Sequence, residues 1–153
     1  GEAVMAADRL LETAKAQADA QVSERNAREK AELMRQLGMD EGESATKASR
    51  TMIRQLEEDQ KRRSKRALTD AIDRALIDLL AIYRDVLMIQ VGGDGELINT
   101  DLADLVGQIA SDSTPRQTLA RVDHIETARK RLVSNGNPLL VLEDMAISLR
   151  PQA

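Results

Sequence analysis

The chain has 153 residues with 22 basic and 26 acidic side chains, so its formal net charge is -4 at pH 7. It holds one Tyr and no Phe, Trp or Cys. This composition excludes disulfides, cysteine nucleophiles, Cys-ligated zinc and aromatic platforms that stack single-stranded bases. Ala and Leu, which are among the best helix formers, take the place of the aromatic residues that favour sheets. The composition therefore predicts an all-α protein.

The sequence lacks the motifs of enzyme active sites. His124 is the one histidine, and the eight glycines form neither a phosphate loop nor a G-x-G-x-x-G turn. No serine stands in a G-x-S-x-G nucleophile elbow. We therefore expect no catalytic site, no metal and no cofactor in this chain.

No apolar run approaches the ~20 residues of a membrane helix. The first residues do not resemble a signal peptide. We therefore expect a cytoplasmic protein.

A long first helix is predicted over residues 2–37. Its apolar residues recur every three or four positions, and because most are Ala, this stripe allows close packing but buries little area. Beyond the stripe the helix is charged, and Gly38 suits the position that follows a helix end. A break is predicted over residues 38–48. The stripe consists of Val4, Ala7, Leu11, Ala14, Ala18 and Val22.

A second long helix is predicted over residues 49–91. Its first part is charged, and its later part keeps one apolar face for five turns. Residues 23–66 should therefore form a charged helical hairpin that projects from a core. We divide the chain into a first helix (1–22), this hairpin (23–66) and a core domain (67–153). The apolar face comprises Leu68, Ile72, Ala75, Leu76, Leu79, Tyr83, Val86 and Leu87.

Three shorter helices should complete a five-helix bundle. Asn99 or Thr100 is suited to cap the third, and Thr-Pro at 114–115 and Asn-Pro at 137–138 are start signals for the fourth and fifth. Arg150 and Pro151 should end the fifth helix. Four consecutive apolar residues, 139–142, cannot all face one core. They either fill the bundle core or leave a patch for a neighbouring subunit.

The motifs of the later half, in their order, resemble a known family. They are YRDVLMIQVG (83–92), TDLADL (100–105), STPRQTL (113–119), VDHIETARKRL (122–132) and NGNPLLVLEDM (135–145). This order is similar to that of C-terminal domains of delta prime subunits of the bacterial DNA polymerase III clamp loader. The resemblance covers residues 67–153 and extends to residues 2–22. Residues 23–66 form a charged extension that resembles a lineage-specific, actinobacterial insertion. The resemblance assigns no function to this extension.

The resemblance implies a non-catalytic oligomerisation domain. In such proteins two AAA+-type domains precede a helical domain, and the helical domains of five subunits form a collar during clamp loading on primed DNA. The phosphate loop and zinc module of the upstream domains are absent here, so we expect a C-terminal piece. The implied partners are other clamp-loader subunits. The collar domain of the ATP-hydrolysing subunit and a stand-alone coiled-coil adaptor are the alternatives.

Two groups of residues are candidate contact sites. The first lies in the matching motifs and is expected at subunit boundaries: Arg84, Asp85, Arg116, Arg129, Arg131, Leu140 and Leu142. The second could contact DNA phosphates: Lys61, Arg62, Arg63, Lys65 and Arg66. A solvated helix face is the preferred interpretation of the second group, because its members point all round the helix and residues 67–153 are acidic.

Overall fold

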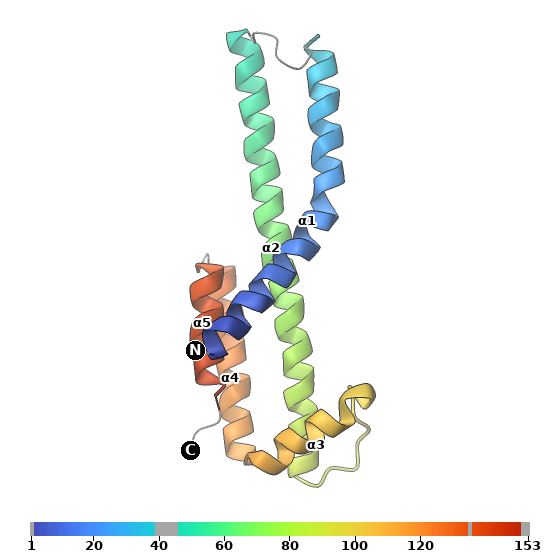
Figure 1. The fold of residues 1–153 in the computed structure, drawn as a ribbon, viewed down its shortest axis with the longest axis vertical. Helices are drawn as coiled ribbons and strands as arrows, with labels where there is room; N and C mark the ends of the chain where they lie inside the picture. The colour runs from blue at the N-terminus through green and yellow to red at the C-terminus, as the bar shows by residue number, and fades with distance from the viewer. Residues whose placement is uncertain (1, 39–45, 135, 151–153) are drawn as a thin grey trace. The chain divides into compact units, whose positions relative to one another are not determined.

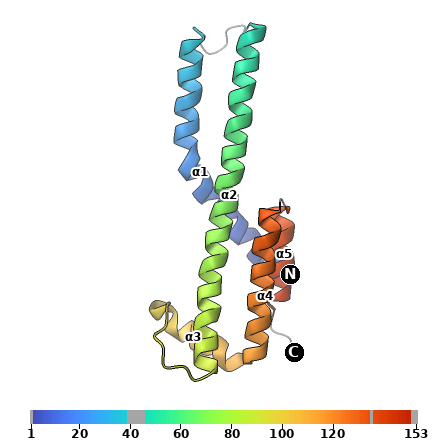
Figure 2. The same cartoon turned by 180° about the vertical axis from the view of Figure 1, so that it is seen from behind.

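A computed structural model of the chain describes residues 2–38, 46–134 and 136–150. Across these residues it contains α-helices, one short 3-10 turn and no strand, which confirms the all-α class (Figures 1 and 2). None of the described helices is long and apolar enough to cross a bilayer. The elements are α1 (Glu2–Gln36), α2 (Lys47–Gln90), η1 (Thr100–Leu102), α3 (Ala103–Asp112), α4 (Pro115–Val133) and α5 (Pro138–Ser148).

The predicted ends of the long helices lie within one or two residues of the observed ends. Helix α5 ends at Ser148, before the predicted Arg150. Most of the predicted break (residues 39–45), together with Pro151, falls outside the described residues. Gly38 has a φ of 64°, a left-handed conformation that Gly adopts at little cost. The prediction that Gly38 follows the end of the first helix is therefore confirmed.

The chain divides into two compact units. We call Gly1–Glu12 with Ile72–Ala153 the bundle unit, and Thr13–Ala71 the hairpin unit. Both long helices contribute to each unit. The boundaries between the units follow residues 12 and 71, whereas the boundaries expected from the sequence follow residues 22 and 66. The bundle unit has 9 basic and 15 acidic residues, whereas the hairpin unit has 13 basic and 11 acidic. The two units therefore carry net charges of opposite sign.

The bundle unit has a core to which all five helices contribute. Helices α4 and α5 pack against each other, and Tyr83 of α2 is 9% exposed, as predicted for a core position. The Arg121 guanidinium lies 5.9 Å from the Tyr83 ring centroid, within the range of a cation–π contact. The buried apolar residues of this unit are Ala7, Leu11, Ile72, Leu76, Tyr83, Val86, Val106, Ile125, Ala128, Leu132, Val141, Leu142 and Met145.

The start signals of α4 and α5 are confirmed. The Thr114 Oγ1 accepts a hydrogen bond from the Gln117 amide at 3.2 Å, and the Gln117 side chain accepts one from the Thr114 amide at 2.9 Å. This reciprocal pair is a capping box. The Asn137 Oδ1 caps α5 by accepting a hydrogen bond from the Leu140 amide at 3.2 Å.

The connection between α4 and α5 requires Gly at position 136. A Cβ on this residue would meet the Arg131 carbonyl oxygen at 2.8 Å.

The predicted cap of the third helix is wrong. The chain enters α3 through η1, and the Asn99 side chain makes no capping hydrogen bond. Instead, the Asn99 Nδ2 donates to the Asp85 Oδ2 at 3.1 Å. A buried carboxylate of α2 therefore competes with the helix end for this side chain.

The hairpin unit consists of antiparallel segments of α1 and α2 that lie side by side in both views (Figures 1 and 2). Its core is formed by Ala18, Val22 and Ala67, with the partly buried Leu68 packed against them. The small Ala side chains allow the two backbones to approach closely. The predicted stripe of α1 is confirmed for Ala7, Leu11, Ala14, Ala18 and Val22, which are all buried. Its first member, Val4, is only partly buried.

Polar contacts join the two helices further along the hairpin unit. The Gln60 Nε2 donates to the Asn26 carbonyl oxygen at 2.8 Å, and the Arg63 Nη1 donates to the Asn26 Oδ1 at 2.8 Å. Arg63 also pairs with Glu29. The hydrogen bond from Arg63 lowers the pKa of Glu29. These contacts replace apolar burial where the sequence between the helices becomes charged.

Candidate subunit interface

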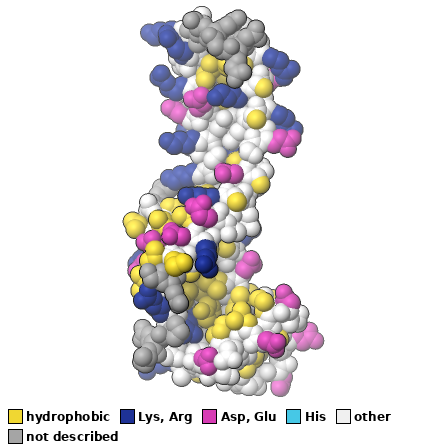
Figure 3. All heavy atoms as spheres, in the orientation of Figure 1, with side chains coloured by type: hydrophobic (Ala, Val, Ile, Leu, Met, Phe, Trp, Pro, Cys, Tyr) yellow, Lys and Arg dark blue, Asp and Glu magenta, His cyan; other side chains and the backbone are white. Residues whose placement is uncertain are grey.

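The exposed large apolar side chains are concentrated on the bundle unit. In Figure 3, hydrophobic side chains gather over α3 and the adjoining part of α2, and also near α5 and the start of α1. Among the described residues, the hairpin unit exposes Met52 alone, whereas the bundle unit exposes ten such residues. Concentrated apolar surface is typical of protein interaction sites. The ten are Met5, Ile77, Ile89, Val91, Ile98, Leu105, Leu119, Val133, Leu140 and Ile147.

Helix α5 carries apolar residues on two opposite faces. Val141, Leu142 and Met145 are buried in the bundle unit. Leu140 is 63% exposed and Ile147, seven residues further, is 50% exposed. A spacing of seven places these two side chains on one face of a helix. The consecutive apolar residues therefore divide, part filling the core and part facing solvent.

Two candidate interface residues are fully buried. Leu142 and Asp85 both have a relative exposure of 0%. They could influence a neighbouring subunit only through the surface residues that they position. Leu140, by contrast, offers most of its side chain to solvent. The Leu residues around position 140 look equivalent in the sequence, and only the packing of α5 separates them.

Asp85 holds the loop that precedes η1. Its Oδ1 accepts from the Ile98 amide at 2.8 Å, and its Oδ2 accepts from the Asn99 amide at 2.8 Å. Burial by itself would raise the pKa of Asp85, but these amides, the Asn99 side chain and Arg84 together lower it. The carboxylate is therefore ionised and satisfied inside the fold. The nearest Arg84 nitrogen lies 3.6 Å from the Asp85 Oδ1, and the Arg84 side chain is half exposed.

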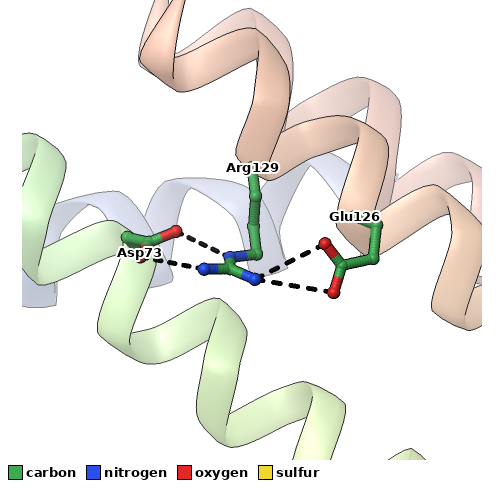
Figure 4. Close-up of polar contacts among 3 residues, drawn as sticks. All are labelled: Asp73, Glu126 and Arg129. Atoms are coloured by element: carbon green, nitrogen blue, oxygen red, sulfur yellow. Dashed lines mark hydrogen bonds and ion pairs between the residues drawn. The ribbon is translucent and has the colours of Figure 1, made fainter.

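Arg129 joins α4 to α2 within the bundle unit, as Figure 4 shows. The Arg129 Nε donates to the Asp73 Oδ1 at 2.8 Å, and its Nη2 donates to the Asp73 Oδ2 at 3.3 Å. The Arg129 Nη1 lies 3.4 Å from a Glu126 oxygen. Such a two-pronged contact fits the planar guanidinium. The side chains of Arg129 and Asp73 are 29% and 32% exposed, so Arg129 serves first as an internal link.

We expect the Arg129–Asp73 pair to contribute measurably to stability. A double-mutant cycle with Arg129→Ala and Asp73→Ala should give a coupling energy of about 1 kcal/mol, at the upper end for pairs near a surface. Urea unfolding of the four chains measures it. The matched control is the Arg131–Asp144 pair, whose side chains are 54% and 61% exposed and whose coupling should stay below about 0.5 kcal/mol. Equal couplings for the two pairs would contradict this prediction.

The remaining polar candidates lie on the surface of α4. The Arg131 Nη1 donates to the Asp144 Oδ2 at 2.6 Å and so links α4 to α5. A groove of about 190 Å³ runs beside this link and is also lined by His124 and Thr127. Arg116 is exposed in the first turn of α4. Arg131 and Arg116 are thus accessible to a partner.

The five basic residues of 61–66 have different surroundings. Arg63 points into the hairpin unit, where it contacts Asn26 and Glu29. Arg62 pairs with Asp59 three residues before it. Lys61, Lys65 and Arg66 are exposed. The structure therefore separates a cluster that is continuous in the sequence.

Comparison with known proteins agrees with the sequence resemblance. The family described as "DNA polymerase III, delta subunit, C terminal" matches residues 43–150. The DNA polymerase III subunit delta' of Bacillus subtilis (strain 168) is 39% identical over 72 residues, which cover 47% of this chain and 22% of the relative. No solved structure matches the chain. The match over residues 43–150 shows that the chain belongs to the family of C-terminal domains of DNA polymerase III delta subunits.

Proposed function

We propose that the chain is a non-catalytic oligomerisation domain of a clamp-loader delta prime subunit. In the bacterial cytoplasm it would hold neighbouring subunits together while the sliding clamp is placed on primed DNA. Family membership supports the assignment to DNA polymerase III, and the likeness to subunit delta' favours delta prime over the ATP-hydrolysing subunit. The observation that carries the proposal is the concentration of exposed apolar side chains on the bundle unit.

The proposed mechanism is burial of these side chains against neighbouring subunits. Each Å² of apolar surface removed from water contributes about 25 cal/mol. A stable interface typically covers about 800 Å² of each partner. Leu140 and Ile147 would lie at the centre of one contact, because α5 presents them together. Arg131, Asp144 and Arg116 would supply the polar rim that gives the contact its orientation.

Sedimentation of the chain with the ATP-hydrolysing clamp-loader subunit of the same organism tests this proposal. The native chain should co-sediment with it, and Leu140→Lys with Ile147→Lys should weaken association at least about tenfold, because a Lys would be buried in an apolar contact. Met52→Lys is the matched control, since Met52 is 48% exposed but lies on the hairpin unit. The Met52→Lys change should have a negligible effect on association.

Two results would overturn the proposal. One is a failure of the native chain to associate when the full-length parent subunit, run alongside, binds normally. The other is an equal loss of association in the Met52→Lys chain and the α5 double variant. The second result would favour the coiled-coil adaptor, in which the hairpin unit makes the contact.

A further inference from the structure

Five basic residues line one face of the first half of α2. Lys47, Arg50, Arg54, Lys61 and Lys65 are all exposed, and we call them the basic stripe. Their separations of three, four, seven and four residues keep them within an arc of about 60° at 100° per residue. Along the axis the stripe extends about 27 Å at 1.5 Å per residue. Figure 3 shows Lys and Arg side chains one above another along the α2 edge of the hairpin unit.

The stripe faces away from α1. Gln60, Arg63 and Ala67 mark the face of α2 that contacts α1, through hydrogen bonds and the small core. The stripe lies about 140° around the helix from that face, as helical geometry requires. None of its five side chains is ion-paired with another described residue, whereas Arg62 and Arg63 both are. The stripe is therefore unused in holding the hairpin unit together.

Acidic residues offset the stripe only in part. Glu57 and Glu58 flank the arc, each about 20° outside it. Glu57 is engaged by Lys30 of α1 at 3.3 Å. Even when both glutamates are counted against the five basic residues, an excess of positive charge remains on this face. A linear excess of positive charge on an exposed helix face attracts a linear polyanion.

We propose that the basic stripe binds the phosphate backbone of double-stranded DNA without reading its sequence. A duplex carries one negative charge per about 1.7 Å of axis, which gives on the order of 16 charges over the length of the stripe. Lys and Arg in a row neutralise phosphates and release counterions. The absence of Phe and Trp from the chain, and the burial of its single Tyr, favour a duplex over a stacked single strand.

An anionic membrane surface fits the basic stripe less well than a DNA duplex does. A helix that lies in a membrane surface inserts large apolar side chains between the charged ones. The one such exposed residue in the described part of 46–66 is Met52, which lies about 170° around α2 from the stripe. The bundle unit, with its excess of acidic residues, would not compete for DNA. This DNA contact would use the hairpin unit and a second kind of partner, apart from the subunit contacts of the bundle unit.

Fluorescence anisotropy of a labelled duplex of about 20 base pairs with the full 153-residue chain tests the proposal. Affinity should fall steeply between about 50 and 200 mM salt. The triple change Arg54→Gln, Lys61→Gln and Lys65→Gln should weaken binding at least about tenfold and reduce the logarithmic salt slope by about 2.7, or about 0.9 per phosphate contact. Gln keeps a high helix propensity, and circular dichroism would verify that the helices persist.

A matched control removes three positive charges from the other helix of the hairpin unit. Arg25→Gln, Arg28→Gln and Arg35→Gln change the net charge equally but leave the stripe intact, and binding should weaken less than about threefold. Equal losses in the two triple variants would overturn the proposal, because net charge alone would then explain the binding. Absence of salt-dependent DNA binding by the native chain, or tighter binding to vesicles of anionic phospholipid or to polyglutamate than to the duplex, would also overturn it.

Discussion

Replacing Leu142 with Ala should lower the free energy of unfolding by about 2–5 kcal/mol. Leu142 has no exposed surface in the bundle unit, so the truncation loses the transfer energy of the removed methyl groups and leaves a cavity. Urea unfolding followed by circular dichroism measures the change. The effect is large because natural domains are stable by only about 5–15 kcal/mol in total.

Leu140→Ala is the matched control for this truncation. Leu140 is the same residue type in the same helix, but it is 63% exposed. Its truncation should change the free energy of unfolding by less than about 1 kcal/mol, since little of its surface is buried in the isolated chain. Equal destabilisation by the two changes would show that α5 packs through a different face. In the proposed clamp-loader assembly, Leu140→Ala should act on association instead.

Replacing Asp85 with Ala should lower the free energy of unfolding by about 2–3 kcal/mol. The change leaves the amides of Ile98 and Asn99 without the carboxylate that accepts their hydrogen bonds. Hydrogen bonds to a charged group contribute about 1.5–3 kcal/mol, and orphaned donors add a further cost. Asp85→Asn should cost less, because its amide oxygen can still accept one of the bonds. The exposed Asp104→Asn on α3 should change stability by less than about 0.5 kcal/mol.

The same carboxylate should make stability depend on pH in the acid range. The pKa of Asp85 is lowered in the folded chain, so the folded state holds its proton more weakly than the unfolded state, whose pKa is about 3.9. The stabilisation is therefore complete well above about pH 4 and is lost as pH falls through the folded pKa. Unfolding at about pH 7 and about pH 3 should show a smaller pH effect in Asp85→Asn than in the native chain. An identical pH effect in both chains would contradict this prediction.

Features that depend on residues within one or two turns could be predicted well. The Ala stripe of α1, the apolar face of α2 and the start signals at Thr114 and Asn137 depend on spacing along one helix. That spacing is visible in the sequence, because a helix places residues three and four apart side by side. The family resemblance was likewise readable, since it rests on motifs in order along the chain. The comparison over residues 43–150 confirms it for the later part of the chain.

Features that depend on which helices meet could not be predicted. Asn99 is a good capping residue, yet the buried Asp85 takes its side-chain amide. Nothing local to Asp85 indicated that two backbone amides more than ten residues later would reach it. Likewise Asp73 and Arg129 are distant in the sequence, and their link required α2 and α4 to lie together.

Short-range spacing and motif order are thus enough to predict the all-α class, the caps of α4 and α5 and the family. Residues that are chemically similar and close in sequence are distinguished only by the packing of the helices. This packing placed Leu142 in the core and Leu140 in solvent, and it turned Arg63 toward α1 while Lys61 and Lys65 face outward. Burial and pairing depend on which residues of a second helix lie beside each side chain. The side chains that a second helix leaves exposed carry both proposals. They are the apolar surface of the bundle unit and the basic stripe of α2.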